Sequence, residues 1–180
     1  NDAYAIAKLA GWKLCDSYNR QYGTEYTTLI PANLYGIHDN FHSDNSHVIP
    51  GLLRRFHEAK MNKLPEVEVW GAGTSRREFL SSDDLAGAIS FLLNREPIAG
   101  AYNVGSGVEV SIRELAETTC DVVGYGGRIV FDSTKPEGVP VRCLDSSKIN
   151  SLGWSASNEL RDGLERVYDW FIRQDNFRGQ

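Results

Sequence analysis

The sequence predicts an α/β fold in which strands alternate with helices along the whole chain. A helical pattern rich in Ala and Leu opens the chain and leads directly into a strand, which is half of a β-α-β crossover. Amphipathic helical patterns and short apolar strands then follow one another to the end of the chain. Neither repeats nor low-complexity tracts interrupt them, so we expect one mixed α/β unit.

Helices are expected where apolar residues recur at helical spacing behind a capping residue. They cover residues 2–22, a stretch that begins near Ser46, 85–93 behind Ser82, 115–123 behind the capping box of Ser111 and Glu114, a short helix ending near Leu152, and a last helix starting at Asn158. Gly23 follows the first helix in the usual place of a residue just past a helix end.

Strands are expected where β-branched and aromatic residues gather between turn residues. They are residues 26–31, 67–70, 78–80, 100–105 and 128–132. The strands at 67–70 and 78–80, separated by Gly71 and Gly73, are expected to form a hairpin-like pair. Residues 37–46 are too polar to belong to the core, and the prolines and glycine within 133–141 predict a second loop.

The composition is that of an ordinary globular protein. The 180 residues, 41% of them hydrophobic and 24% charged, can bury a sizeable core. A net charge of -5 without basic clusters argues against nucleic acid and anionic membranes as partners, so an anionic ligand must be held locally. No apolar run approaches the roughly 20 residues of a membrane span, and no signal peptide pattern opens the chain, which predicts a cytoplasmic protein. Because the chain starts inside a helical pattern without Met, we expect it to be part of a longer one.

The cysteines and histidines do not predict a metal site. Cys15, Cys120 and Cys143 are odd in number and lack C-x-x-C spacing, so buried free thiols are expected. His38 and His42 lie in the polar loop near aspartates. Their spacing fits no zinc pattern, and a solvated loop is favoured over a metal site.

Tyr4 and Lys8 are the first candidates for chemistry. Four residues is about one helical turn, so both side chains project from the same helix face. An ammonium group beside a phenol favours the phenolate, which lets a tyrosine exchange protons with a carbonyl substrate. The alternative is a chance pairing on an exposed helix, and the spacing alone does not decide between them.

Four ordered motifs resemble the extended short-chain dehydrogenase/reductase superfamily that acts on nucleotide sugars. They are Tyr4-x-x-x-Lys8, a strand ending in Pro31-x-Asn33-Leu34-Tyr35-Gly36, Arg77-Glu78-Phe79 with Asp83-Asp84, and Tyr102-Asn103-Val104-Gly105. Further stretches resemble its GDP-L-fucose synthase branch: residues 33–42, 46–50, 52–56, 69–74 and 135–138. The resemblance covers nearly the entire chain.

The resemblance implies the carboxy-terminal part of a Rossmann-like, doubly wound NAD(P)-binding fold plus a smaller mixed α/β substrate-binding domain. Residues 1–46, with about 78–105, would finish the NADP-binding domain. Residues 47–77 and 106–180 would bind the nucleotide sugar. The family's glycine-rich phosphate loop, catalytic Ser or Thr and epimerase Cys lie upstream of the tyrosine and are absent here, so the chain alone is expected to be inactive.

The implied reaction is the NADPH-dependent conversion of GDP-4-keto-6-deoxymannose by 3,5-epimerisation and 4-keto reduction. Tyr4 would protonate the alkoxide, and Lys8 would hold the nicotinamide ribose. His47 resembles the epimerisation acid, since imidazole holds or releases a proton near neutral pH. Its alternative role is to cap the helix that follows.

The remaining implied contacts divide between cofactor and substrate. Residues matching NADP(H) positions are Tyr4, Lys8, Pro31, Asn33, Leu34 and His47, although plain strand termination could explain Leu34 and its neighbours. Residues matching substrate positions are Arg55, Trp70, Arg77 and Arg142, the arginines suiting diphosphate oxygens. Val141 departs from the family beside Arg142, as Ala3 does before Tyr4. Arg54, Arg76, Arg113 and Arg128 are interpreted as solvated charges.

Two other readings stay open. One is another nucleotide-sugar epimerase or dehydratase of the superfamily; the 4-epimerases lack His47 and its flanks, and this feature distinguishes the two readings. The other is a non-catalytic binding protein that kept the fold. In the superfamily the tyrosine helix commonly packs against its equivalent in a second subunit, so a homodimer is expected, with Trp12 and Tyr18 as candidate contacts.

Overall fold

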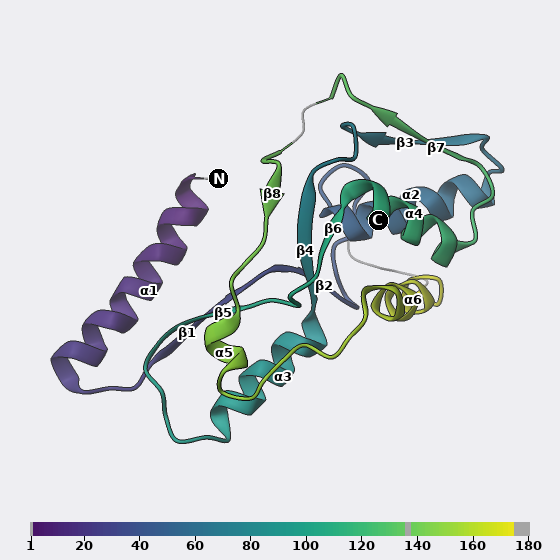
Figure 1. The fold of residues 1–180 in the computed structure, drawn as a ribbon. Helices are drawn as coiled ribbons and strands as arrows, with labels where there is room; N and C mark the ends of the chain where they lie inside the picture. The colour runs from purple at the N-terminus through teal and green to yellow at the C-terminus, as the bar shows by residue number, and fades with distance from the viewer. Residues whose placement is uncertain (1, 136–137, 175–180) are drawn as a thin grey trace.

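The computed structural model describes residues 2–135 and 138–174 (Figure 1). Its helices are α1 (Asp2–Tyr22), α2 (Val48–Met61), α3 (Ser82–Leu93), α4 (Ile112–Val123), α5 (Ser147–Asn150) and α6 (Leu160–Phe171). Its strands are β1 (Thr27–Pro31), β2 (Asn33–Tyr35), β3 (Glu66–Trp70), β4 (Arg76–Ser81), β5 (Gly100–Val104), β6 (Glu109–Ser111), β7 (Arg128–Asp132) and β8 (Val141–Arg142).

The strands pair mostly in parallel, which confirms the α/β class. β1 lies parallel to β5, β2 to β4, and β3 to β7. β4 also pairs with β6 in the antiparallel sense and with β8 in parallel. Strands that pair in parallel need a crossover connection, and the helices between them provide it.

The expected hairpin of β3 and β4 is wrong. β3 pairs with β7, and the ladder continues past its end through the Gly71 amide, which donates to Asp132 O at 2.8 Å. Gly71 and Gly73 both have positive φ, at 86° and 77°. These left-handed positions turn the chain away from β3, so β4 reaches β2 and β6 instead of folding back on its neighbour.

Two apolar clusters form the core. The larger gathers around α2, α4 and α6, with β3 against them, and includes Leu53, Phe56, Leu115 and Leu164, which are fully buried. The smaller lies between α3, β5 and α5 and includes Leu80, Ala88, Val104 and Ile149. Neighbouring β4 residues divide between the clusters, since Phe79 joins the first and Leu80 the second.

The polar loop before α2 reaches the core after all. Phe41 is 0% exposed and stacks on Phe171 of α6 at 4.7 Å between ring centroids. Arg54 of α2 donates to Phe41 O at 2.8 Å and fixes the loop there. One aromatic side chain therefore anchors a stretch whose other residues, apart from the exposed Ile37, are polar.

Several boundaries differ slightly from expectation. α2 begins at Val48 rather than Ser46, Ser81 rather than Ser82 caps α3, and Asn33 to Tyr35 form a strand of their own. Both reciprocal hydrogen bonds of the Ser111 and Glu114 capping box are present, as predicted. The second expected loop ends where β8 begins, and its residues 136 and 137 lie outside the described part.

α1 stands apart from the rest of the molecule (Figure 1). None of its residues is buried, and Tyr4, Leu14 and Tyr22 are more than half exposed. Its carboxyl end is tied to β1 by Asn19, whose side chain exchanges two hydrogen bonds with the Tyr26 backbone. Within residues 2–135 and 138–174, no helix has the length and apolar character needed to cross a membrane.

Candidate active site

Tyr4 and Lys8 lie together on α1. The Lys8 Nζ atom is 5.4 Å from the centroid of the Tyr4 ring, and the Tyr4 side chain is 67% exposed. The phenol is therefore open to a reactant, with an ammonium group beside it. The arrangement can supply a proton next to a positive charge, which is what reduction of a ketone needs.

The carboxyl end of β1 carries the second group of candidates. Pro31 ends the strand, Asn33 begins β2, and Leu34 is 37% exposed. The chain leaves α1 by a short turn, and β1 then runs in the direction opposite to α1 (Figure 1). Ligands of parallel sheets bind beyond the carboxyl ends of strands, which suits this edge.

His47 occupies the N-cap position of α2. Its backbone is extended, with φ of -70° and ψ of 167°, and its side chain makes no capping hydrogen bond. The imidazole is exposed. A purely capping role is therefore not what the side chain performs, and its nitrogen atoms are accessible to a reactant.

Arg77 and Arg142 are brought together across the fold. They are register partners in the parallel pairing of β4 with β8. Registered residues of neighbouring strands project from the same sheet face, so the two guanidinium groups share one side. Arg77 donates to its neighbour Arg76 O at 2.7 Å. Two cations on one face can neutralise a diphosphate. They would supply the local positive charge that a chain with an acidic net charge needs to hold an anion.

Trp70 ends β3, and Arg55 of α2 is hydrogen-bonded to the same strand. Trp70 is 61% exposed, and the Lys135 Nζ atom lies 5.9 Å from its ring centroid. Arg55 of α2 donates to Glu68 O at 3.0 Å, two residues before Trp70. An exposed aromatic ring with Lys135 over it and Arg55 on a neighbouring helix is suited to an anionic nucleotide. α1, with Tyr4 and Lys8, stands away from this group (Figure 1).

The arginines interpreted as solvated charges also make specific contacts. Arg54 pairs with Glu58 at 2.6 Å, and Arg128 pairs with Glu66 at 2.8 Å. Arg113 stacks over the Phe131 ring at 3.9 Å and donates to Ala72 O. Arg113 and Arg128 remain exposed, as expected of solvated charges, with 80% of the Arg128 side chain accessible, whereas only 20% of the Arg54 side chain is accessible.

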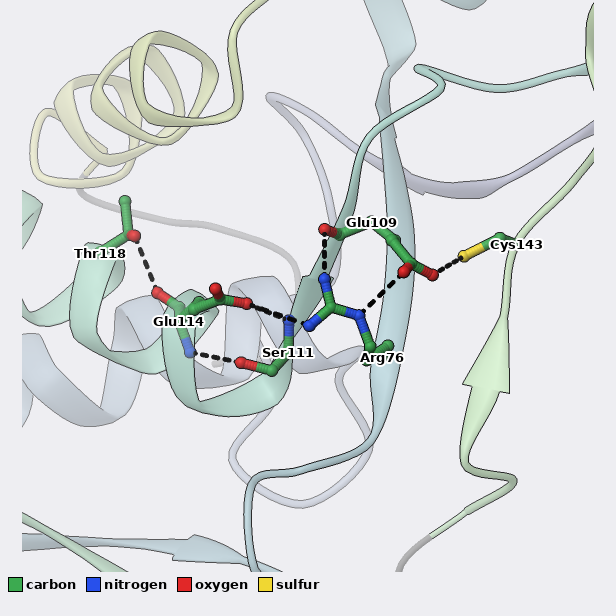
Figure 2. Close-up of polar contacts among 6 residues, drawn as sticks. All are labelled: Arg76, Glu109, Ser111, Glu114, Thr118 and Cys143. Atoms are coloured by element: carbon green, nitrogen blue, oxygen red, sulfur yellow. Dashed lines mark hydrogen bonds and ion pairs between the residues drawn. The ribbon is translucent and has the colours of Figure 1, made fainter.

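Arg76 organises a polar network that sequence reasoning missed (Figure 2). Its Nε donates to Glu109 Oε1 at 3.0 Å, and its Nη1 lies 3.8 Å from Glu114 Oε2. The Cys143 thiol donates to Glu109 Oε2 at 3.0 Å. Cys143 is exposed rather than buried, contrary to expectation, while Cys15 is half-buried and Cys120 buried. Of the contact between Arg76 and Glu109, the sequence shows only that the two residues carry opposite charges.

Cys143 should react slowly with iodoacetamide despite its exposure. Desolvation and the hydrogen bond to Glu109 raise the pKa of its thiol from 9.0 to about 11. At pH 8 this leaves about a hundredfold less thiolate, which higher nucleophilicity partly offsets, so alkylation should be about tenfold slower than for an ordinary thiol. Glu109→Gln should accelerate it, as measured by mass spectrometry with Cys15 as internal reference. An unchanged rate in that variant would contradict the assignment.

Metal ligands do not gather in the described part of the chain. No group of three His, Cys, Asp or Glu side chains there could hold an ion. His38 instead packs edge-on against Trp170 at 4.8 Å.

Comparison with known proteins places these features in context. The chain is 53% identical to GDP-L-fucose synthase of Escherichia coli strain K12 over 189 aligned positions, covering 99% of the chain and 59% of that protein. It is 54% identical to GDP-L-fucose synthase 1 of Arabidopsis thaliana, covering 96% and 54%. The structure matches that of a GDP-L-fucose synthetase from Naegleria fowleri bound to NADP, with a TM-score of 0.88, 29% identity and coverage of 96% and 56%.

The chain thus spans a little over half the length of the relatives it matches. Residues 1–105, which hold Tyr4, Lys8, His47 and the parallel strands β1, β2 and β5, match the family described as "NAD dependent epimerase/dehydratase family". This match covers more than half of the chain, and the Rossmann-like fold of the solved neighbours agrees with the observed α/β architecture. The chain belongs to the NAD dependent epimerase/dehydratase family.

Proposed function

We propose that the chain is the substrate-binding and proton-donating part of a GDP-L-fucose synthase. Such an enzyme converts GDP-4-keto-6-deoxymannose to GDP-L-fucose by epimerisation at C3 and C5 and reduction at C4. The observation that carries the proposal is the 53% identity to the Escherichia coli enzyme across 99% of the chain. That stretch includes every candidate named above.

In this proposal Tyr4 gives its proton to the oxygen of the reduced C4 carbon. The Lys8 ammonium, 5.4 Å from the Tyr4 ring centroid, stabilises the phenolate that remains. Lys8 also hydrogen-bonds the cofactor ribose, for which it has three donors. Both groups are exposed, so a ligand can reach them without rearrangement of the helix.

The residues of this chain fit part of an NADP(H) site. When bound, the cofactor supplies the hydride. Pro31 and Leu34 would border it at the carboxyl end of β1, where Leu34 offers exposed apolar surface. The Asn33 amide is held by Glu78 O at 2.8 Å, which fixes this edge in place. His47 also matches a cofactor position of the family.

His47 acts as the acid of epimerisation. Returning a proton to C3 and C5 needs an accessible acid, a role that histidine side chains commonly take, and His47 is exposed at the start of α2. Since its side chain makes no capping bond, the residue can be changed without loss of a helix cap.

His47→Asn should abolish epimerisation and leave the fold intact. We would test it in a composite enzyme, in which residues 1–180 are joined to the part of the Escherichia coli relative that the match leaves uncovered. Deuterium incorporation from heavy water at C3 and C5 should fall by about 10²–10⁴, the usual contribution of a general acid or base. Incorporation at the original rate would contradict the role. His57→Asn, a change on the same helix, serves as control.

Arg77, Arg142, Arg55 and Trp70 bind the GDP part of the substrate. The proposal rests on the two arginines that share a face of the β4–β8 pair and on the exposed Trp70 ring. The proposed GDP site is tested by isothermal titration calorimetry of the chain with GDP. Arg77→Ala should weaken binding about tenfold or more, since a charge-assisted hydrogen bond is lost. Arg161→Ala, at an exposed arginine of α6 that pairs with Asp121 and Glu165, is the control; equal affinity in the Arg77 variant would refute the site.

We also propose the assembly, domain division and compartment expected from the sequence. Of the two expected contacts on α1, Tyr18 is exposed and Trp12 is half-buried, and Leu14 adds exposed apolar surface, which supports a homodimer formed through this helix. Light scattering of the composite enzyme should show twice the monomer mass, and a monomer would oppose the proposal. Residues 1–46 with about 78–105 serve the cofactor, and 47–77 with 106–180 the substrate. The three free cysteines support a cytoplasmic enzyme.

A further inference from the structure

Glu78 is a buried carboxylate at the centre of the fold. It is 2% exposed and lies in β4 between Arg77 and Phe79. Its Oε1 accepts the Gly107 amide at 2.8 Å, and its Oε2 accepts the Leu144 amide at 2.8 Å. Burying a carboxylate is costly unless it is hydrogen-bonded, and here both oxygens are satisfied by backbone donors from two separate segments.

The Leu144 bond lies directly behind the arginine pair. Successive strand residues face opposite sides, so Glu78 projects from the side of β4 opposite Arg77. Leu144 follows Arg142 by two residues. Through its hydrogen bond to the Leu144 amide, the carboxylate therefore holds the segment that places Arg142 beside Arg77, and it does so from the opposite face of β4.

β8 needs such a hold because it is short. It consists of Val141 and Arg142, and its pairing with β4 is continued by the Arg76 amide, which donates to Pro140 O at 2.7 Å. On the same rear side, Glu109 accepts the Cys143 thiol (Figure 2). A two-residue strand gains few ladder bonds, so side chains must supply the rest of its anchoring.

Gly105 leaves room for the Glu78 carboxylate because it has no side chain. A Cβ atom at this position would fall on the Glu78 carboxyl group. Gly105 follows β5, whose partner β1 ends at the proposed cofactor edge, and Glu78 O accepts the Asn33 side chain there. Glu78 thus joins the substrate face and the cofactor edge through its own strand.

We propose that Glu78 is a positioning residue that holds Arg142 next to Arg77 and so assembles the diphosphate-binding pair. The inference rests on the proposed binding of GDP by these arginines. Glu78 itself touches no ligand, and its effect on binding passes through Arg142. It follows that loss of Glu78 should matter only while Arg142 is present.

The test is a double-mutant cycle on the 180-residue chain, with GDP as the probe and calorimetry as the readout. Glu78→Gln presents an amide group to one of the two backbone donors and should weaken GDP binding about tenfold. In an Arg142→Ala background, the same change should cause no further loss. Gly105→Ala, which displaces the carboxylate from the other side, should reproduce both results.

Asp84→Asn is the matched control. Asp84 is 5% exposed and accepts the backbone amides of Ser157 and Asn158, so its loss removes a similar anchor away from the arginines. This variant should be less stable yet bind GDP normally. If it weakens binding as much as Glu78→Gln, the effect is general destabilisation and the proposal is overturned.

The other outcomes are equally distinct. Unchanged GDP affinity in Glu78→Gln, or equal losses with and without Arg142, would overturn the positioning role while leaving the GDP site standing. If the unaltered chain fails to bind GDP, the proposed function itself is refuted, and the inference falls with it. If Glu78→Gln does not fold, Gly105→Ala and its combination with Arg142→Ala decide the matter.

Discussion

Tyr4→Phe should lower kcat for ketone reduction in the composite enzyme by about 10²–10⁴. The substitution removes one oxygen atom from an exposed side chain. Because α1 has no buried residue, the change should leave the stability of the fold unaltered. What disappears is the proton that the C4 oxygen must receive. The rate is measured as oxidation of NADPH with the keto sugar.

Tyr22→Phe provides the control for this loss. Tyr22 lies on the same helix and is 63% exposed, close to the 67% of Tyr4, but it takes no part in the proposed reduction. It should retain the full rate. Full activity in the Tyr4 variant would remove the proton donor from the account.

Phe56→Ala should destabilise the protein by about 3–5 kcal/mol. The Phe56 side chain is 0% exposed in the larger core, where its ring lies 5.7 Å from that of Tyr125. Truncation leaves a cavity between α2 and the end of α4. The free energy of unfolding, measured by urea denaturation of the chain, gives the loss directly.

Met61→Ala is the matched comparison on the same helix. Met61 is 67% exposed and should change the free energy of unfolding by less than about 0.5 kcal/mol. α2 carries Arg55 and follows His47, so its packing through Phe56 holds both candidates in place. A loss below about 1 kcal/mol for Phe56→Ala would show that the core is not organised around this helix.

Features that depend on neighbouring residues were predictable from the sequence. The capping box of Ser111 and Glu114 is local, because both of its hydrogen bonds span three residues. The same holds for Tyr4 and Lys8, which helical spacing alone brings together. In the part of the chain that the structure describes, the six helices and five of the strands were therefore located to within a few residues, whereas the short strands β2, β6 and β8 were not predicted.

Features that depend on distant segments were not predictable in this way. The pairing of β3 with β7 joins residues about 60 positions apart, and the sequence of neither strand indicates which strand it pairs with. Phe41 reaches the core because Trp170 and Phe171 come from the far end of the chain. Glu78 was hidden for the same reason, since both of its donors lie in later loops.

The candidate site shows the same division. Resemblance to a family indicated Arg77 and Arg142 separately, and Val141 made the second of them uncertain. Their shared face emerges only from the β4–β8 register. The electrostatic reason for the pair, an acidic chain that must hold an anion, was nevertheless available from composition.

The most direct test of the central claim is product formation by the composite enzyme. Supplied with GDP-4-keto-6-deoxymannose and NADPH, it should release GDP-L-fucose, identified by chromatography against an authentic standard and by mass spectrometry. The Escherichia coli enzyme serves as the positive control in the same assay. A folded composite enzyme that binds NADPH and GDP yet forms no GDP-L-fucose would contradict the account.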